Sequence, residues 1–135
     1  NEAFDKGNFD KAIATLKEAL EADPQYLAAR KNLSIAYNNQ GTKISRDKRV
    51  KNYRMALYVW DGNDTARKNL KSHLEHSGSN PDSYLDRLKL ASEFASIGDY
   101  VSATVEAREA LRLKKSKSTE EQLAEYEKKA PPLPD

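Results

Sequence analysis

The chain has 135 residues, which is enough for one domain with a buried core. Charged residues make up 33% of it, the formal net charge is only +2, and cysteine is absent. This balance disfavours a membrane-embedded chain, a strongly basic nucleic-acid-binding domain, disulfides and thiolate metal sites. Alanine, leucine, lysine and glutamate dominate, which favours helices. The composition does not fix the cellular compartment.

The first strong helical pattern lies before residue 24. Its apolar side chains fall on one helix face at Ala12, Leu16, Ala19 and Leu20. The pair Asp23-Pro24 predicts the end of this helix and a capped start for the next. Residues 1–6 are expected to supply only the last turn of a preceding helix, so the first hairpin is incomplete.

The middle of the chain predicts three further helices. Residues 25–40 carry an apolar stripe that ends at Gly41, where we expect a left-handed exit from the helix. Residues 46–60 carry a second stripe that includes Trp60. Residues 63–77 carry a thinner one, and the Gly-containing segment 77–81 that follows it predicts a hinge.

The last part of the chain predicts a hairpin and a final helix. Asn80-Pro81 restarts a helix that we expect to turn Leu85 and Ala91 inward. Gly98 ends this helix and Asp99 caps the next. The spacing Ser118-x-x-Glu121 is typical of a capping box and predicts a last helix, followed by a proline-rich end of the chain.

Two internal offsets connect these segments. The run Ala29-Arg30-Lys31-Asn32-Leu33 recurs 37 residues later, beginning at Ala66. A second set of matches, from Gly7 and Phe9 to Gly98 and Tyr100, is offset by 91 residues. Because 91 exceeds twice 37 by about half a hairpin, we expect an extra or irregular helix near the middle.

These motifs resemble the tetratricopeptide repeat. Residues 7–24, with Gly7-Asn8-Phe9 and Asp23-Pro24, are similar to the second half of such a repeat, and Leu33 to Gly41 resembles its first helix. The resemblance implies an all-α, right-handed solenoid of antiparallel helix hairpins with an irregular or extra helix in the middle and a C-terminal capping helix. The expected parts are a partial repeat 1–24, a repeat 25–61, a helix 62–77, a repeat 81–115, a capping helix 118–130 and a proline-rich tail 131–135.

The resemblance also implies a role in protein binding, because the first helices of successive hairpins line a concave groove. Asn32 and Asn69 recur at one repeat position although asparagine is a poor helix former. Either they bond the backbone of a bound peptide, or they bond a neighbouring helix or record a shared ancestral repeat. The candidate partner-binding residues are Lys31, Asn32, Ile35, Asn38, Asn39, Lys68, Asn69, Ser72, Leu88, Lys89 and Ser92.

The leading function is therefore a non-catalytic scaffold that binds a peptide or helix of a partner protein. One alternative is a structural protein that self-associates into a homo-oligomer through its repeat surfaces. A weaker alternative is an RNA- or lipid-surface module that uses the basic cluster Lys43, Arg46, Lys48, Arg49, Lys51 and Arg54. Nucleic acid is disfavoured as a partner because acidic residues elsewhere balance the cluster and aromatic stacking partners are few.

Catalytic and metal chemistry find no support in the motifs. His73 and His76 are three residues apart, but a third metal ligand on their face is not evident. Nucleophile–base arrangements and phosphate-binding glycine loops are not discernible. We therefore expect no enzyme activity, no cofactor and no metal.

Overall fold

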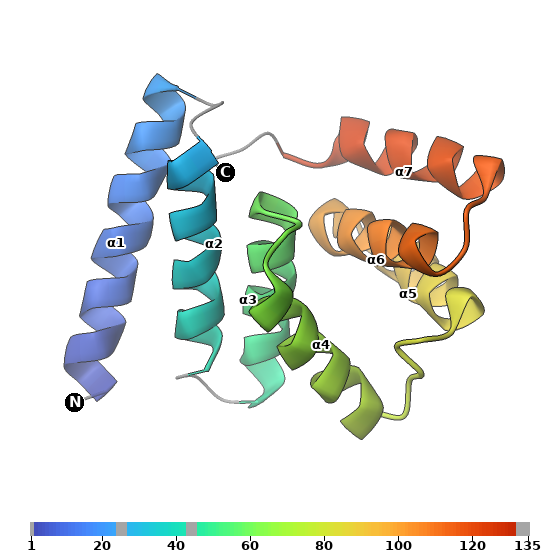
Figure 1. Cartoon of the computed structure of the whole chain (residues 1–135), viewed down its shortest axis with the longest axis horizontal. Coiled ribbons are helices and arrows are strands. Elements are labelled where there is room, and N and C mark those ends of the chain that lie inside the picture. Colours follow the sequence, from blue (N-terminus) through green and yellow to red (C-terminus); the bar gives the residue numbers. More distant parts are fainter. Residues whose placement is uncertain (1, 24–26, 43–45, 132–135) are drawn as a thin grey trace. The chain divides into compact units, whose positions relative to one another are not determined.

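The computed structural model describes residues 2–23, 27–42 and 46–131. Within these ranges the protein is all-helical, as the sequence predicts (Figure 1). The helices are α1 (Glu2–Ala22), α2 (Leu27–Gly41), α3 (Arg46–Val59), α4 (Asp64–His76), α5 (Tyr84–Ser96), α6 (Tyr100–Leu113) and α7 (Lys117–Lys129). The predicted cap at Asp23-Pro24 and the proline-rich tail fall largely outside the described residues.

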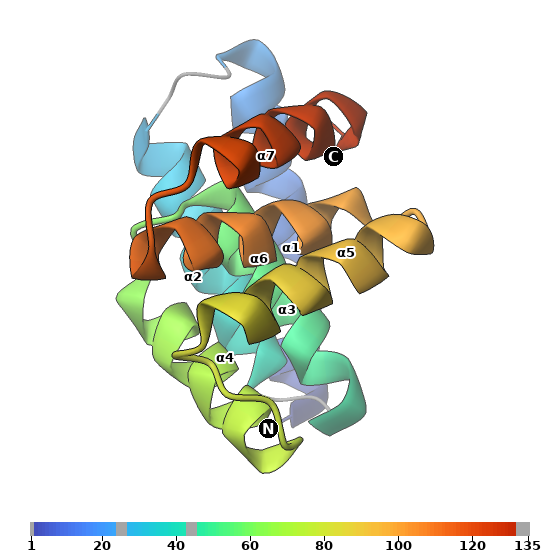
Figure 2. The ribbon, with the colours of Figure 1, turned by 90° about the vertical axis from the view of Figure 1, so that its right-hand side faces the viewer.

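The chain divides into two compact units. The first unit runs up to Leu70, and the second runs from Lys71 to Pro131, so the division lies inside α4. Within the first unit α2 packs against both α1 and α3, and within the second α6 packs against both α5 and α7 (Figures 1 and 2). Each unit is thus a short row of neighbouring helices, the packing typical of a tetratricopeptide-like solenoid.

The core of the first unit forms where α1, α2 and α3 meet. Leu20 and Leu33 are fully or almost fully buried there, together with Ala29, Ala36 and Val59. Small alanines let the α2 backbone approach its neighbours closely, while the leucines fill the remaining space. The expected inward position of Ala12 is wrong: its side chain is exposed. Ile13 and Leu20 set the packed side of α1, and Ala12 lies about 100° around the helix from Ile13.

Helix α1 is longer than the motif at its centre suggests. It runs without interruption from Glu2 to Ala22 and passes through Gly7. We expected residues 1–6 to belong to a separate preceding helix. A single glycine costs a helix only about 1 kcal/mol, so Gly7 weakens the helix without ending it.

Gly41 has a different role from the expected left-handed exit. Positive φ angles among the described glycines occur at Gly78 (φ 89°) and Gly98 (φ 82°), whereas Gly41 remains within α2. A Cβ atom added to Gly41 would lie 3.0 Å from Cε1 of Tyr53 and 3.1 Å from Cβ of Asn52. Gly41 therefore permits a close approach between α2 and α3.

The second unit packs around the side of α6 that carries small side chains. Ala103 and Ala107 of α6 are buried with Ala91 of α5 and Tyr126 of α7. The predicted cap at Asp99 is confirmed, because its side chain accepts a hydrogen bond from the backbone N–H of Ser102 at 3.0 Å. Gly98 supplies the left-handed turn just before it.

Two details of the second unit differ from expectation. Leu85 is 72% exposed, because the buried side of α5 is set by Arg87 and Ala91, and Leu85 lies about 200° from Arg87 around the helix. The last helix is capped by Ser116, whose side chain accepts from the N–H of Thr119. The capping box predicted at Ser118 is therefore wrong by two residues, since the helix already begins at Lys117.

Candidate partner-binding surface

The predicted residues of α2 divide into two groups. Asn32, Ile35 and Asn39 are exposed on one side of the helix, and Lys31 at the edge of this side is half-buried. Asn38, in contrast, is only 5% exposed. The opposite side of α2 packs into the core, so the exposed group forms one continuous surface along the helix.

Helix α4 lies beside α2 in the first unit. Nδ2 of Asn69 donates a hydrogen bond of 2.9 Å to Oδ1 of Asn38, and this bond joins the two helices. Lys68, next to Asn69, is exposed. Two explanations were open for the recurring asparagine. For Asn69, this contact matches a bond to a neighbouring helix. Asn32 is exposed, so its amide remains accessible to a partner.

A buried polar network beneath this surface was not anticipated. Ser34 is fully buried, and its hydroxyl donates to the backbone oxygen of Ala56. Nδ2 of Asn63 donates to the Ser34 hydroxyl at 2.9 Å, while its Oδ1 accepts from the N–H of Ala66 at 3.0 Å. Asn63 thereby caps α4 and connects it to α2. An asparagine directly before Asp64 at a helix start is the sequence signal that could have revealed it.

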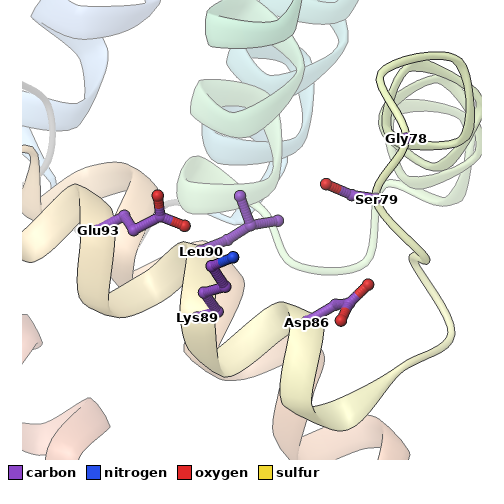
Figure 3. Close-up of a pocket in the computed structure, with 6 residues that line it drawn as sticks. All are labelled: Gly78, Ser79, Asp86, Lys89, Leu90 and Glu93. Atoms are coloured by element: carbon purple, nitrogen blue, oxygen red, sulfur yellow. The ribbon is translucent and has the colours of Figure 1, made fainter.

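The candidate residues of the second unit lie on α5. Ser92 and Lys89 are exposed, Leu88 is half-buried, and Ser72 is exposed on the end of α4 that belongs to this unit. Lys89 lines a hollow of about 140 Å³ between α5 and the turn that follows α4 (Figure 3). The other lining residues are Gly78, Ser79, Asp86, Leu90 and Glu93.

This hollow is small and mixed in charge. Asp86 also accepts a hydrogen bond from the backbone N–H of Asn80 at 2.9 Å, so this carboxylate helps to hold the turn that forms the rim. One lysine among two carboxylates gives no clear preference for an anion or a cation. The hollow brings together only Lys89 from the predicted set.

A buried ion pair also escaped sequence reasoning. Nη1 of Arg87 lies 2.8 Å from Oε1 of Glu106, and the two side chains are 4% and 0% exposed. Nε of Arg87 donates to the backbone oxygen of Pro81 at 2.9 Å. The pair therefore joins α5 to α6 and fixes the turn before α5. Its role is structural, since neither side chain is open to a ligand.

Two tyrosines of the second unit have shifted pKa values. Hydrogen bonds with Ser116 and Thr119 lower the pKa of Tyr84, with a smaller contribution from the charge of Lys114. Burial raises the pKa of Tyr126, and the neighbouring Tyr100 adds to this shift. Both residues tie α7 to the rest of the unit, because the Tyr84 hydroxyl contacts that of Thr119 and the Tyr126 ring packs with Ala91, Ala103 and Ala107.

The basic cluster and the histidine pair are arranged as follows. Lys48 and Lys51 are exposed on α3, but Arg54 is only 5% exposed and does not belong to an open basic surface. Nδ1 of His76 lies 2.9 Å from the backbone oxygen of Ser72. Across the described ranges, no three histidine or acidic side chains gather as a metal site would require. In the same ranges, no helix is long and apolar enough to cross a membrane.

The comparisons with known proteins address the first hairpin. Residues 3–42 match the family model described as tetratricopeptide repeat. The match spans α1 and α2 and includes both motifs that carry the resemblance, so this segment of the chain is similar to a tetratricopeptide repeat. The general role of this family is protein–protein interaction. Neither a curated protein nor a solved structure matches the chain.

Proposed function

We propose that the chain is a non-catalytic scaffold that holds a peptide or helix of a partner protein on the exposed side of α2. The observation that carries this proposal is the division of α2 into a packed side and an open side. The open side presents Asn32, Ile35 and Asn39 within the segment that matches the repeat family. Lys68 of α4, next in sequence to Asn69, is also exposed in the first unit, and we include it as a candidate partner contact.

The chemistry of this surface suits a peptide. Each asparagine amide offers two donors and one acceptor, so it can bond both the C=O and the N–H groups of a peptide backbone. Ile35, which is 45% exposed, offers an apolar contact at the centre of the polar side chains. Backbone hydrogen bonds supply affinity and the apolar contact supplies selectivity.

The same side chains support a binding role rather than catalysis. Amide, alkyl and ammonium groups do not form a nucleophile with an adjacent base. His76 contacts the backbone oxygen of Ser72 rather than a hydroxyl group. We include Ser72, Leu88, Lys89 and Ser92 in the proposal as candidate partner contacts of the second unit.

Selection from a displayed library of random 12-residue peptides tests the proposal. We expect peptides that bind the whole chain and lose affinity about tenfold or more when Ile35→Asp or the pair Asn32→Ala and Asn39→Ala is introduced. Gln122→Ala is the matched control, because it removes an exposed amide from α7. Circular dichroism verifies that each variant is folded. Failure to select any peptide, or equal binding by all variants, would overturn the proposal.

A further inference from the structure

Two exposed apolar side chains flank a lysine at the edge of the open side of α2. Leu27 is 53% exposed and Ile35 is 45% exposed, and Lys31 lies midway between them. Residues spaced by four lie on the same side of a helix, about 6 Å apart along its axis. We call Leu27, Lys31 and Ile35 the α2 stripe. Its order is apolar, cationic, apolar.

The lysine of the stripe is held in place by an aromatic ring. Nζ of Lys31 lies 5.2 Å from the ring centroid of Trp60, within the range of a cation–π contact. Lys31 and Trp60 are both half-buried. The alkyl stem therefore packs against the protein while the ammonium group remains at the surface. This contact fixes a positive charge between two apolar side chains.

The charge of Lys31 is not balanced by its own helix. Helix α2 contains no aspartate or glutamate, and its second cation, Arg30, donates from Nε to the backbone oxygen of Val59. Asp61, in the turn before α4, and Asp64, the first residue of α4, both form ion pairs with Arg67. Among the described residues, no ion pair includes Lys31. The stripe thus presents an uncompensated cation.

We propose that the α2 stripe binds a partner segment that carries a carboxylate between two apolar side chains. A basic segment would bring like charges together, and a wholly apolar segment would bury the ammonium group without a hydrogen-bond acceptor. An acidic side chain at the centre satisfies the ammonium while its neighbours cover Leu27 and Ile35. This inference rests on the proposed function and names the class of partner.

The selected peptides provide the test. We expect an excess of aspartate or glutamate flanked by apolar residues, and weaker binding as salt is added. Lys31→Glu should reduce the affinity of such a peptide about fivefold or more, and Lys31→Gln should reduce it less. A peptide with lysine in place of its central carboxylate should bind Lys31→Glu better than it binds the wild-type chain.

A matched control separates the local attraction to Lys31 from an effect of the net charge of the chain. Lys51→Glu introduces the same charge change at an exposed lysine of α3, in the same unit, and should leave the affinity within about twofold. Equal losses for the two reversals would overturn the inference, because the attraction would then be non-specific. Peptides that bind the open side of α2 without acidic residues would overturn it while leaving the proposed function intact. Failure to select any peptide would overturn both.

Discussion

Nδ2 of Asn69 in α4 donates a hydrogen bond to Oδ1 of Asn38 in α2 at a distance of 2.9 Å. Asn38 is almost completely buried and Asn69 is half-buried. A buried amide oxygen without a partner is costly, so this bond helps to hold α4 against α2. The two asparagines stabilise the helix pair beneath the proposed partner surface.

The first prediction concerns the coupling of this pair. Asn69→Ala leaves the buried oxygen of Asn38 without this donor and should lower the free energy of unfolding by about 1–2 kcal/mol. The variant with both asparagines replaced by alanine should lose less than the sum of the single variants, because neither partner is then left unpaired. Urea denaturation of the three variants measures this coupling. Strict additivity would show that the bond contributes nothing.

Asn32 serves as the comparison for this pair. It occupies the corresponding repeat position but is exposed. Asn32→Ala should leave the free energy of unfolding within about 0.5 kcal/mol of the wild-type value. Its effect should appear in peptide binding instead.

Much of the fold follows from the sequence, since helical spacing and terminal signals agree along most of the chain. The cap at Asp99 and the turn at Gly98 were predictable because each depends on a few neighbouring residues. Leu20 and Leu33 were predictable as core because they lie on the apolar sides of two consecutive helices. The family match at residues 3–42 supports the same reasoning.

Several errors arose where a contact depends on residues distant in sequence. Gly41 is required by the ring of Tyr53, which no local pattern reveals. The buried side of α5 includes Arg87 because Glu106 of α6 neutralises it, and this leaves Leu85 outside. The residues of the open side of α2 were identifiable from their spacing, whereas the engagement of Asn38 by Asn69 was one of two alternatives that spacing could not separate.

The second prediction concerns the buried ion pair of the second unit. Arg87→Ala leaves the fully buried carboxylate of Glu106 without its positively charged partner. The change should lower the free energy of unfolding by about 3–5 kcal/mol. Arg108→Ala is the matched control, because Arg108 pairs with Glu127 at 3.3 Å near the surface. This control should cost no more than about 1 kcal/mol. Similar losses in thermal or urea denaturation would contradict a special role for the buried pair.

The third prediction concerns the close approach at Gly41. Glycine to alanine within a helix normally stabilises it by about 1 kcal/mol. Here the new methyl group would lie 3.0 Å from the Tyr53 ring, so Gly41→Ala should instead destabilise the chain by about 1–2 kcal/mol. Adding Tyr53→Ala should reduce the penalty of the glycine change, measured against Tyr53→Ala alone, because only the contact with Cβ of Asn52 at 3.1 Å then remains. A more stable Gly41→Ala variant would refute the close contact.

The fourth prediction is a pH dependence. Burial raises the pKa of Tyr126 above its ordinary value of 10.0, so the folded chain keeps this proton at a pH where the unfolded chain loses it. The contribution of Tyr126 to the free energy of unfolding is therefore complete below pH 10.0 and falls as the pH rises through the folded-state pKa. Tyr126→Phe cannot ionise and should lack this fall.

Urea denaturation at pH 9 and pH 11 provides the measurement, with the two pH values chosen to lie about one unit on either side of the ordinary tyrosine pKa. Lysine titration affects the wild-type chain and Tyr126→Phe alike, so the difference between them isolates Tyr126. Tyr84 is present in both, and its lowered pKa cancels in the same way. A difference that does not change with pH would rule out a titrating, buried Tyr126.

The central claim is that the open side of α2 holds a partner segment. A titration of the isotope-labelled whole chain with a library-selected peptide, followed by amide chemical shifts, tests this claim most directly. The account predicts that the largest shifts fall on Asn32, Ile35, Asn39 and the adjacent Lys68. Largest shifts confined to α6 and α7, with α2 unchanged, would contradict it.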